Sequence, residues 1–280
     1  MQFCKIKKEK FMSGKLYFVA TPIGNLGDIS FRAIETLKSV DIILCEDTRT
    51  SLKLLDHYGI KKPLLPYHKF NYKTAIPKII ENLLSGTTYA LISDAGMPCV
   101  SDPGSEIIPY LVENKIEYTI VPGACAFMCA VALSNTKPPY TFVGFLPDNK
   151  KDERKMLENL KNSTSSLIFY VAPHKLVATI SSLNKAFGDR NCVTVREITK
   201  IYEEVEHFSL NDGYPKEPKG EYVLIVDGCS EKENAFENLS IIEHYELYAS
   251  QGLTKNEAIK KVAKDRNVPK NEIYSKIVNK

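Results

Sequence analysis

The sequence predicts an α/β protein with two successive α/β domains and a small helical module at the C-terminal end. Two stretches, 14–147 and 148–230, alternate short apolar runs with amphipathic helical patterns, as strand–helix units do. The stretch DNKKDERKMLENLKNS at 148–163 predicts a charged amphipathic helix and marks the boundary between them. From 231 to 280 the strand patterns stop and three helical patterns follow.

Composition limits the classes of function. With 37 basic and 34 acidic residues the net charge is +3, so a nucleic acid must be met by a local patch. The seven Cys include no CxxC pair, which predicts reduced thiols, no disulfide framework and no metal site. The longest apolar run, Ala124–Leu133, is too short to span a bilayer. We therefore expect a soluble, cytoplasmic protein with no membrane partner.

Residues 1–13 form a basic N-terminal tail with Lys5, Lys7, Lys8 and Lys10 and little periodicity. Two interpretations stay open, a solvated tail or translation from an upstream start ahead of Met12. Contact of these lysines with RNA phosphates is a further alternative.

The first domain should be a sheet whose strands are separated by helices. The expected strands are Leu16–Ala20, Asp41–Cys45, Pro63–Tyr67, Tyr89–Ile92, Tyr118–Val121 and Phe142–Leu146, and the helices between them include Ser30–Lys38, Thr74–Leu84, Glu106–Val112 and a small-residue helix after Gly123. The small residues of that last helix allow close approach to a ligand, or tight packing on the sheet.

The loop Ser93–Gly104 is the strongest candidate for a ligand site. It holds two Asp, two Gly, two Pro and two Ser between a buried strand and a helix, where open α/β sheets bind ligands. The alternative is that Asp102 or Ser105 only caps the next helix. The loop after the first strand has Gly24 and Gly27, which match neither a Rossmann nor a Walker A motif. Glu46–Arg49 after the second strand either meet ligand hydroxyls or cap a helix.

The second domain should contain strands Leu167–Val171, Cys192–Arg196, Lys200–Phe208 and Glu221–Val226 and a helix from His174 to Phe187. Two such domains imply a cleft between them. In the C-terminal module, Thr254–Glu257 is a capping-box pattern and Pro269 opens a third helix. Thr254–Lys280 carries eight Lys and Arg against three Asp and Glu, which suits nucleic-acid docking or simply a soluble helix face.

Seven motifs follow one another along the chain: ATPIGNLGDIS, CEDTRTS, ISDAGMPCVSDPG, VPG, GFLP, APHK and REITKIYEE. In these motifs and their order the chain resembles, over about residues 14–228, the ribosomal small-subunit methyltransferase I family, a branch of the tetrapyrrole methylase superfamily. The resemblance implies a class III methyltransferase that binds S-adenosylmethionine between its domains and methylates the ribose 2′-hydroxyl of a decoding-centre cytidine in 16S rRNA of the small ribosomal subunit. It also implies a homodimer.

Carried over by position, the resemblance places the cofactor against residues of three loops and one strand end of the second domain. These are Pro22, Gly24, Asp94, Gly96, Met97, Ser101, Asp102, Gly123, Ala124, Cys125, Val171 and Ala172. Glu197 and the neighbourhood of Gly220–Tyr222 would close the cleft. The chain departs from the family pattern at Met97, at Gly123–Ala126 and most clearly at Tyr170–Lys175, where an expected Glu is missing.

Methyl transfer from a sulfonium needs alignment and exclusion of water, and no metal or covalent intermediate. A base near the hydroxyl would help, and the candidates for this catalytic role are Asp47, Asp102, Glu197 and Lys200. The candidates for RNA contact are Arg49, Lys175, Arg196, Lys260, Lys261 and Lys264. For each charged residue a structural ion pair remains the alternative. Methylation of a corrinoid precursor, or a non-catalytic role in RNA binding and assembly, are the competing functions.

Overall fold

The computed structural model describes residues 13–229, 239–266 and 268–278, so the predicted basic tail lies outside the described residues except for Ser13. The first unit is built on a five-stranded sheet with the order β3-β2-β4-β1-β5, in which all neighbouring strands are parallel. Its strands are β1 (Lys15–Val19), β2 (Ile42–Cys45), β3 (Leu64–Pro66), β4 (Tyr89–Ile92) and β5 (Glu117–Val121). The central strand β4 reads YALI and is buried throughout, as expected of a strand covered on both faces.

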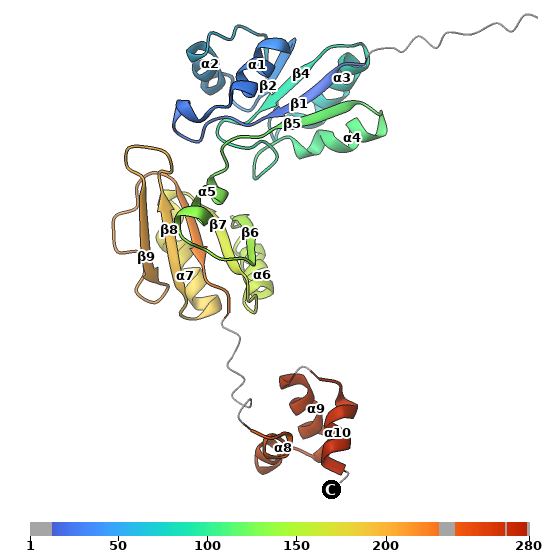
Figure 1. The fold of residues 1–280 in the computed structure, drawn as a ribbon, viewed down its shortest axis with the longest axis vertical. Helices are drawn as coiled ribbons and strands as arrows, with labels where there is room; N and C mark the ends of the chain where they lie inside the picture. Colours follow the sequence, from blue (N-terminus) through green and yellow to red (C-terminus); the bar gives the residue numbers. More distant parts are fainter. Residues whose placement is uncertain (1–12, 230–238, 267, 279–280) are drawn as a thin grey trace, which may run out of the picture.

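Helices cover both faces of this sheet (Figure 1). On one face α1 (Phe31–Ser39) and α2 (Thr48–His57) contribute Ala33, Leu37 and Leu55 to a core. On the other, α3 (Tyr72–Leu84) and α4 (Ile108–Glu113) pack against alternate residues of the same strands. Short 3₁₀ turns, η1 (Leu26–Asp28) and η2 (Ser105–Ile107), lie in the loops that follow β1 and β4.

The second sheet has the order β6-β7-β10-β8-β9, with β6 parallel to β7 and the other pairs antiparallel. Its strands are β6 (Tyr140–Phe145), β7 (Ser166–Val171), β8 (Asn191–Arg196), β9 (Glu204–Ser209) and β10 (Tyr222–Val226). One face packs on α6 (Lys150–Leu160) and, after the turn η3 (Pro173–Lys175), on α7 (Leu176–Phe187). The opposite face is covered by α5 (Ala126–Leu133).

The structure differs from the sequence-based expectation at two points. The boundary expected after residue 147 cuts through the second sheet, because β6 pairs with β7 and α5 packs on β7 and β10. The charged amphipathic helix expected in this stretch is confirmed as α6, a surface helix whose apolar side faces the second sheet. The strand expected from Lys200 starts only at Glu204, since Lys200 lies in a turn in which its carbonyl accepts from the Glu203 N–H (3.1 Å).

The C-terminal module consists of α8 (Ile241–Ser250), α9 (Lys255–Asp265) and α10 (Lys270–Val278), around a small core that includes Tyr248, Ile259 and Ile273. The predicted capping box is present, with the Thr254 N–H donating to the Glu257 carboxylate at 3.0 Å. Pro269 lies immediately before α10 rather than within it. Within the described residues, no helix combines the length and apolar character needed to cross a membrane.

Candidate functional site

The loops after β1 and β4 are joined to each other at the carboxyl edge of the first sheet. The Thr21 N–H donates to the Gly96 carbonyl (2.9 Å) and the Gly96 N–H to the Thr21 carbonyl (3.1 Å). The Thr21 hydroxyl donates to the Ser93 carbonyl at 3.2 Å. Because β1 and β4 are neighbours whose connections leave in opposite directions, this edge is where a parallel sheet opens to a ligand.

Close approach explains why Gly96 is a glycine. Its φ is +84°, and a Cβ there would lie 3.0 Å from Ile23 Cγ2. Two non-glycine residues of the same loop, Cys99 and Ser101, also have positive φ (68° each), a conformation that costs energy and must be held by its surroundings. The loop is therefore held in one compact shape that brings its backbone to the ligand edge.

A cavity of about 380 Å³ lies between the two units, against this loop. Eight of the predicted cofactor residues line it: Asp94, Gly96, Met97, Ser101, Asp102, Cys125, Val171 and Ala172. The other four, Pro22, Gly24, Gly123 and Ala124, are not lining residues, but each lies within two residues of a lining residue, Ile23 or Cys125.

The apolar walls of the cavity include residues that the sequence analysis did not single out. They are Ile23, Val100, Phe145, Val195, Ile198 and Val223, of which four come from or follow strands of the second sheet. Tyr170, in the segment that departs from the family pattern, also lines the cavity, and its hydroxyl accepts from the Phe127 N–H at 3.3 Å. Burial raises the pKa of Tyr170, so its hydroxyl stays protonated at neutral pH. The sequence could have indicated these wall residues only if the pairing of the strands in the second, largely antiparallel sheet had been known.

Carboxylates of the first unit give the cavity a negative character. Burial, together with the neighbouring Glu46 and Asp94, raises the pKa of Asp102 to about 7. Burial and Asp94 also raise the pKa of Glu46, and burial raises that of Asp94. Such mutual repulsion in a partly dry site is relieved by a cation. Across the described segments, no group of three His, Cys, Asp or Glu side chains is placed to hold a metal ion.

Asp47 is placed as a helix cap. Its carboxylate accepts from the Arg49 N–H (2.8 Å) at the start of α2, while its own N–H donates to Asp94 Oδ1 at 3.3 Å. Of the two interpretations for Glu46–Arg49, helix capping is therefore the one seen for Asp47. The backbone N–H of Asp47 also orients the carboxylate of Asp94. Arg49 is exposed on α2.

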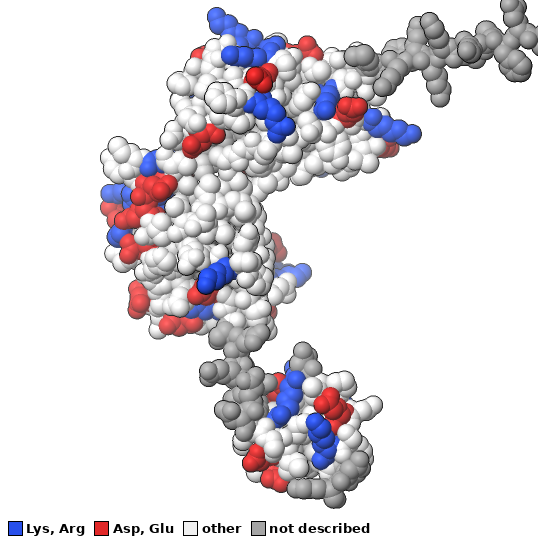
Figure 2. Space-filling view, viewed as in Figure 1, with Lys and Arg blue, Asp and Glu red and all other residues white. Residues whose placement is uncertain are grey.

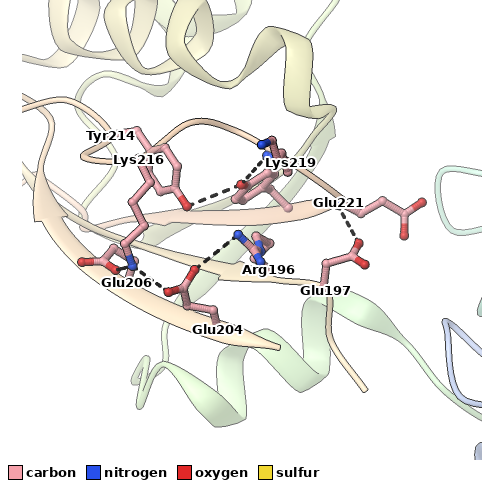
Figure 3. Close-up of polar contacts among 9 residues, drawn as sticks. Arg196, Glu197, Glu204, Glu206, Tyr214, Lys216, Lys219 and Glu221 are labelled. Atoms are coloured by element: carbon pink, nitrogen blue, oxygen red, sulfur yellow. Dashed lines mark hydrogen bonds and ion pairs between the residues drawn. The ribbon is translucent and has the colours of Figure 1, made fainter. Parts of the chain in front are cut away.

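Glu197 and Lys200 lie on the other side of the cavity in an ion-paired group with Glu221, a lining residue. Lys200 Nζ lies 3.0 Å from Glu197 Oε1 and 2.8 Å from Glu221 Oε2. The Glu221 N–H donates to Glu197 at 2.9 Å (Figure 3). Burial acts to lower the pKa of Lys200, but its hydrogen bonds to Glu221 and Glu197 raise it. In this arrangement Lys200 is a protonated donor and not a proton acceptor.

Lys200 also connects the two units. A Cβ on Gly24, in the loop after β1, would lie 2.6 Å from Lys200 Cε and Cγ, so the lysine stem lies directly against the glycine backbone. Gly220 meets Glu197 in the same way, with a Cβ 2.6 Å from Glu197 Cδ. The ion-paired group Glu197–Lys200–Glu221 thus seals one side of the cavity against the first unit.

The predicted RNA-contact residues fall in separate places. Arg196 is mostly buried and pairs with Glu204 (3.5 Å), which also binds Lys216 (2.6 Å; Figure 3). Lys175 is exposed and pairs with Asp148. Lys260, Lys261 and Lys264 are exposed along α9, with Lys261 Nζ 4.6 Å from the Tyr248 ring centroid. Arg196 is therefore part of a structural network, whereas the others are accessible.

Comparison with known proteins identifies relatives over nearly the whole chain. The family model of tetrapyrrole (corrin/porphyrin) methylases matches residues 15–212. The chain is 46% identical to ribosomal RNA small subunit methyltransferase I of Bacillus subtilis, over 93% of each chain. It is 44% identical to the protein of the same name from Halalkalibacterium halodurans, over 94% of each. Among solved structures, uroporphyrin-III-C-methyltransferase from Thermus thermophilus has a TM-score of 0.54 at 19% identity, covering 76% of this chain and 94% of that one, which supports the fold alone.

Proposed function

The chain belongs to the tetrapyrrole methylase family and, within it, to the family of ribosomal RNA small subunit methyltransferase I, and from this premise we propose that it methylates the ribose 2′-hydroxyl of a decoding-centre cytidine in 16S rRNA. The methyl donor of these families is S-adenosylmethionine. The single observation that carries the proposal is the carboxylate-lined cavity between the two units.

The residues of the cavity fit this cofactor. When bound, it supplies a methyl group on a positively charged sulfonium, and it also carries an amino group. The cluster of Glu46, Asp94 and Asp102 suits such a cation. The apolar walls suit the uncharged part of the ligand, and the tight turn at Gly96 lets backbone groups reach it.

Residues of the chain then have three tasks. The apolar walls exclude water, the loops after β1 and β4 orient the reacting groups, and Asp102 takes the proton of the hydroxyl. Among the four predicted catalytic candidates, Asp102 lines the cavity and has a pKa of about 7, close to the optimum for a general base at neutral pH. Asp47 caps α2, and Glu197 and Lys200 neutralise each other, so these three act by holding the site in place.

The acceptor in this proposal is RNA of the small subunit. Arg49, Lys175 and the exposed lysines of α9 provide positive charge for phosphates, while Arg196 supports the wall of the cavity. The enzyme would act in the cytoplasm, where ribosomes assemble. We place the dimer contact at the edge strand β5, where Tyr118 and Ile120 are exposed.

The test is methyl transfer from radiolabelled S-adenosylmethionine to small ribosomal subunits that lack the modification, followed by mapping of the label. We expect label on one cytidine, stable to alkali because a 2′-O-methyl group blocks strand cleavage at that position. Label on a corrinoid precursor and none on rRNA would favour a tetrapyrrole methylase. Binding of RNA without any transfer would favour a non-catalytic assembly protein.

A further inference from the structure

Phe70 is presented to solvent on a rigid turn. It lies in the loop between β3 and α3 and is 84% exposed. The Asn71 side chain accepts from the His68 N–H (2.8 Å) and donates to the Pro66 carbonyl (2.9 Å), and the Tyr72 N–H donates to the His68 carbonyl (3.1 Å). The hydrogen bonds of the turn therefore hold the backbone of Phe70 in place and leave its ring free to contact a partner.

The neighbours of Phe70 are a cation and a second ring. Lys69 Nζ lies 5.0 Å from the centroid of the Phe70 ring, and the His68 ring packs edge-on at 6.1 Å. A ring next to an ammonium group is the combination with which proteins hold single-stranded nucleic acid, because the ring stacks on a base and the cation meets a phosphate.

The loop of Phe70 lies where the two units meet. The hydrogen bond from Lys175 and, more weakly, Lys69 and His174 lower the pKa of Asp148. Lys69 and His68 also oppose the burial that raises the pKa of Glu46, beside Asp94 and Asp102. Lys69 is therefore near both units. Phe145, three residues before Asp148, lines the cavity and is 57% exposed.

Charge distinguishes the Phe70 loop from the β9 edge of the second sheet. Lys69, His174 and Lys175 all act on the carboxylate of Asp148, and Lys69 also acts on that of Glu46. At the β9 edge, by contrast, Glu204 and Glu206 share Lys216, and Figure 2 shows acidic and basic side chains side by side there. Among the described residues Lys69 forms no ion pair within 4 Å and can meet an RNA phosphate, whereas Lys216 is held by Glu204 and Glu206.

A ribose can reach an enclosed site only when its nucleotide leaves the stacked helix, and the bases beside it then lose their stacking partners. We propose that Phe70 stacks on an unpaired base next to the methylated nucleotide, with Lys69 contacting the adjoining phosphate. The inference rests on the proposed RNA methylation and adds how the acceptor is held.

The experiment measures initial rates of label transfer from radiolabelled S-adenosylmethionine to small subunits lacking the modification, over a range of subunit concentrations. Phe70→Ala should raise KM for the subunit about tenfold, or about 1.4 kcal/mol, with kcat within about twofold. Phe70→Trp should keep the wild-type KM, whereas Phe70→Leu should behave like Phe70→Ala because it cannot stack. Cofactor affinity, measured by calorimetry, should be the same in all variants.

Phe31 offers a matched control. It is 88% exposed and also lies in the first unit, but it opens α1 in the helical layer on the opposite face of the sheet from α3. Phe31→Ala should leave KM unchanged. An unchanged KM in Phe70→Ala overturns the inference, and so does a Leu variant as good as the Trp variant, because that indicates an apolar protein contact. If the wild-type enzyme transfers no label to the subunit, the proposed function itself is wrong. The results for the variants bear only on the role of Phe70.

Discussion

The two α/β units contribute to the cavity in different ways. The first has an all-parallel sheet, so its strand ends deliver loops to one edge, and from these come the acidic groups and the tight turn at Gly96. The second sheet is mostly antiparallel and contributes Val195, Val223 and the aromatic Tyr170 as walls. The difference indicates that the first unit sets ligand charge and orientation, whereas the second keeps water out.

The largest effect is expected from a side chain that fills the tight turn at Gly96 in the first unit. Gly96→Val adds a β-branched side chain at φ +84° and pushes against Ile23, so we expect cofactor affinity to fall at least about 100-fold, or about 3 kcal/mol. Isothermal calorimetry measures this. Gly59→Val is the control, since Gly59 has φ +65° but nothing within 4 Å of a Cβ. The Gly59→Val variant should lose stability and keep its cofactor affinity. If both variants lost affinity equally, the Gly96 turn would have no specific role in cofactor binding.

The acidic character of the first unit predicts a pH dependence of stability without cofactor. Asp102 has a pKa of about 7 in the folded protein against an ordinary pKa of 3.8, so between these two pH values the folded state holds a proton that the unfolded chain releases. Its contribution is fully present below pH 3.8 and is lost as the pH rises through 7. We expect a loss of about 2 kcal/mol, allowing for partial exposure of the carboxyl.

Asp102→Asn, which mimics the protonated group, should flatten this decline in urea unfolding at pH 5 and 8. Asp41 serves as the control of opposite sign. Its hydrogen bonds from the Thr88 side chain and backbone lower the pKa, so its contribution is lost as the pH falls through that lowered value. Asp41→Asn should therefore remove stability at neutral pH. A decline unchanged in Asp102→Asn would argue against a desolvated carboxyl in the cavity.

The second unit is tested at its ion-paired side. Lys200→Met removes the cation shared by Glu197 and Glu221, and we expect KM for the cofactor to rise about threefold to tenfold because the wall near Gly24 loosens. The pH profile of kcat should keep its shape, because Lys200 is not the base. Lys216→Met is the matched control, since it breaks ion pairs with Glu204 and Glu206 outside the cavity lining. A change in the shape of the profile would assign Lys200 a catalytic role.

The smallest effect is expected outside both units, on α9. The double change Lys260→Ala and Lys264→Ala should weaken binding to the small subunit about twofold to fivefold in moderate salt. The slope of log affinity against log salt should fall by about 0.7–0.9 per lysine that touches a phosphate. Cofactor affinity should not change. Lys78→Ala, which removes a surface lysine paired with Glu81 on α3, should leave the slope as it is.

The sequence predicted the first unit well for a physical reason. Buried parallel strands such as Tyr89–Ile92 read as continuous apolar runs, and their loops carry Gly and Asp where ligands bind. It misplaced the boundary because α5 reads AFMCAVAL, with no polar side to tell which sheet it covers. Ile201 and Tyr202 look like strand residues but lie exposed in the turn before β9. The pairing of Lys200 with Glu221, 21 residues apart, depends on tertiary contacts that no local pattern contains.

The helix α5 decides which fragments of this chain can exist alone. It follows β5 directly but buries Ala130 against Ile168, Val195 and Ile225 of the second sheet. A fragment that begins at residue 148 would lack both the edge strand β6 and the cover of α5. Its second sheet would then expose an apolar face, which promotes aggregation. A piece that starts just after β5, near Pro122, would keep both. For expression of fragments, labelling or circular permutation, the boundary between the two units therefore lies before α5.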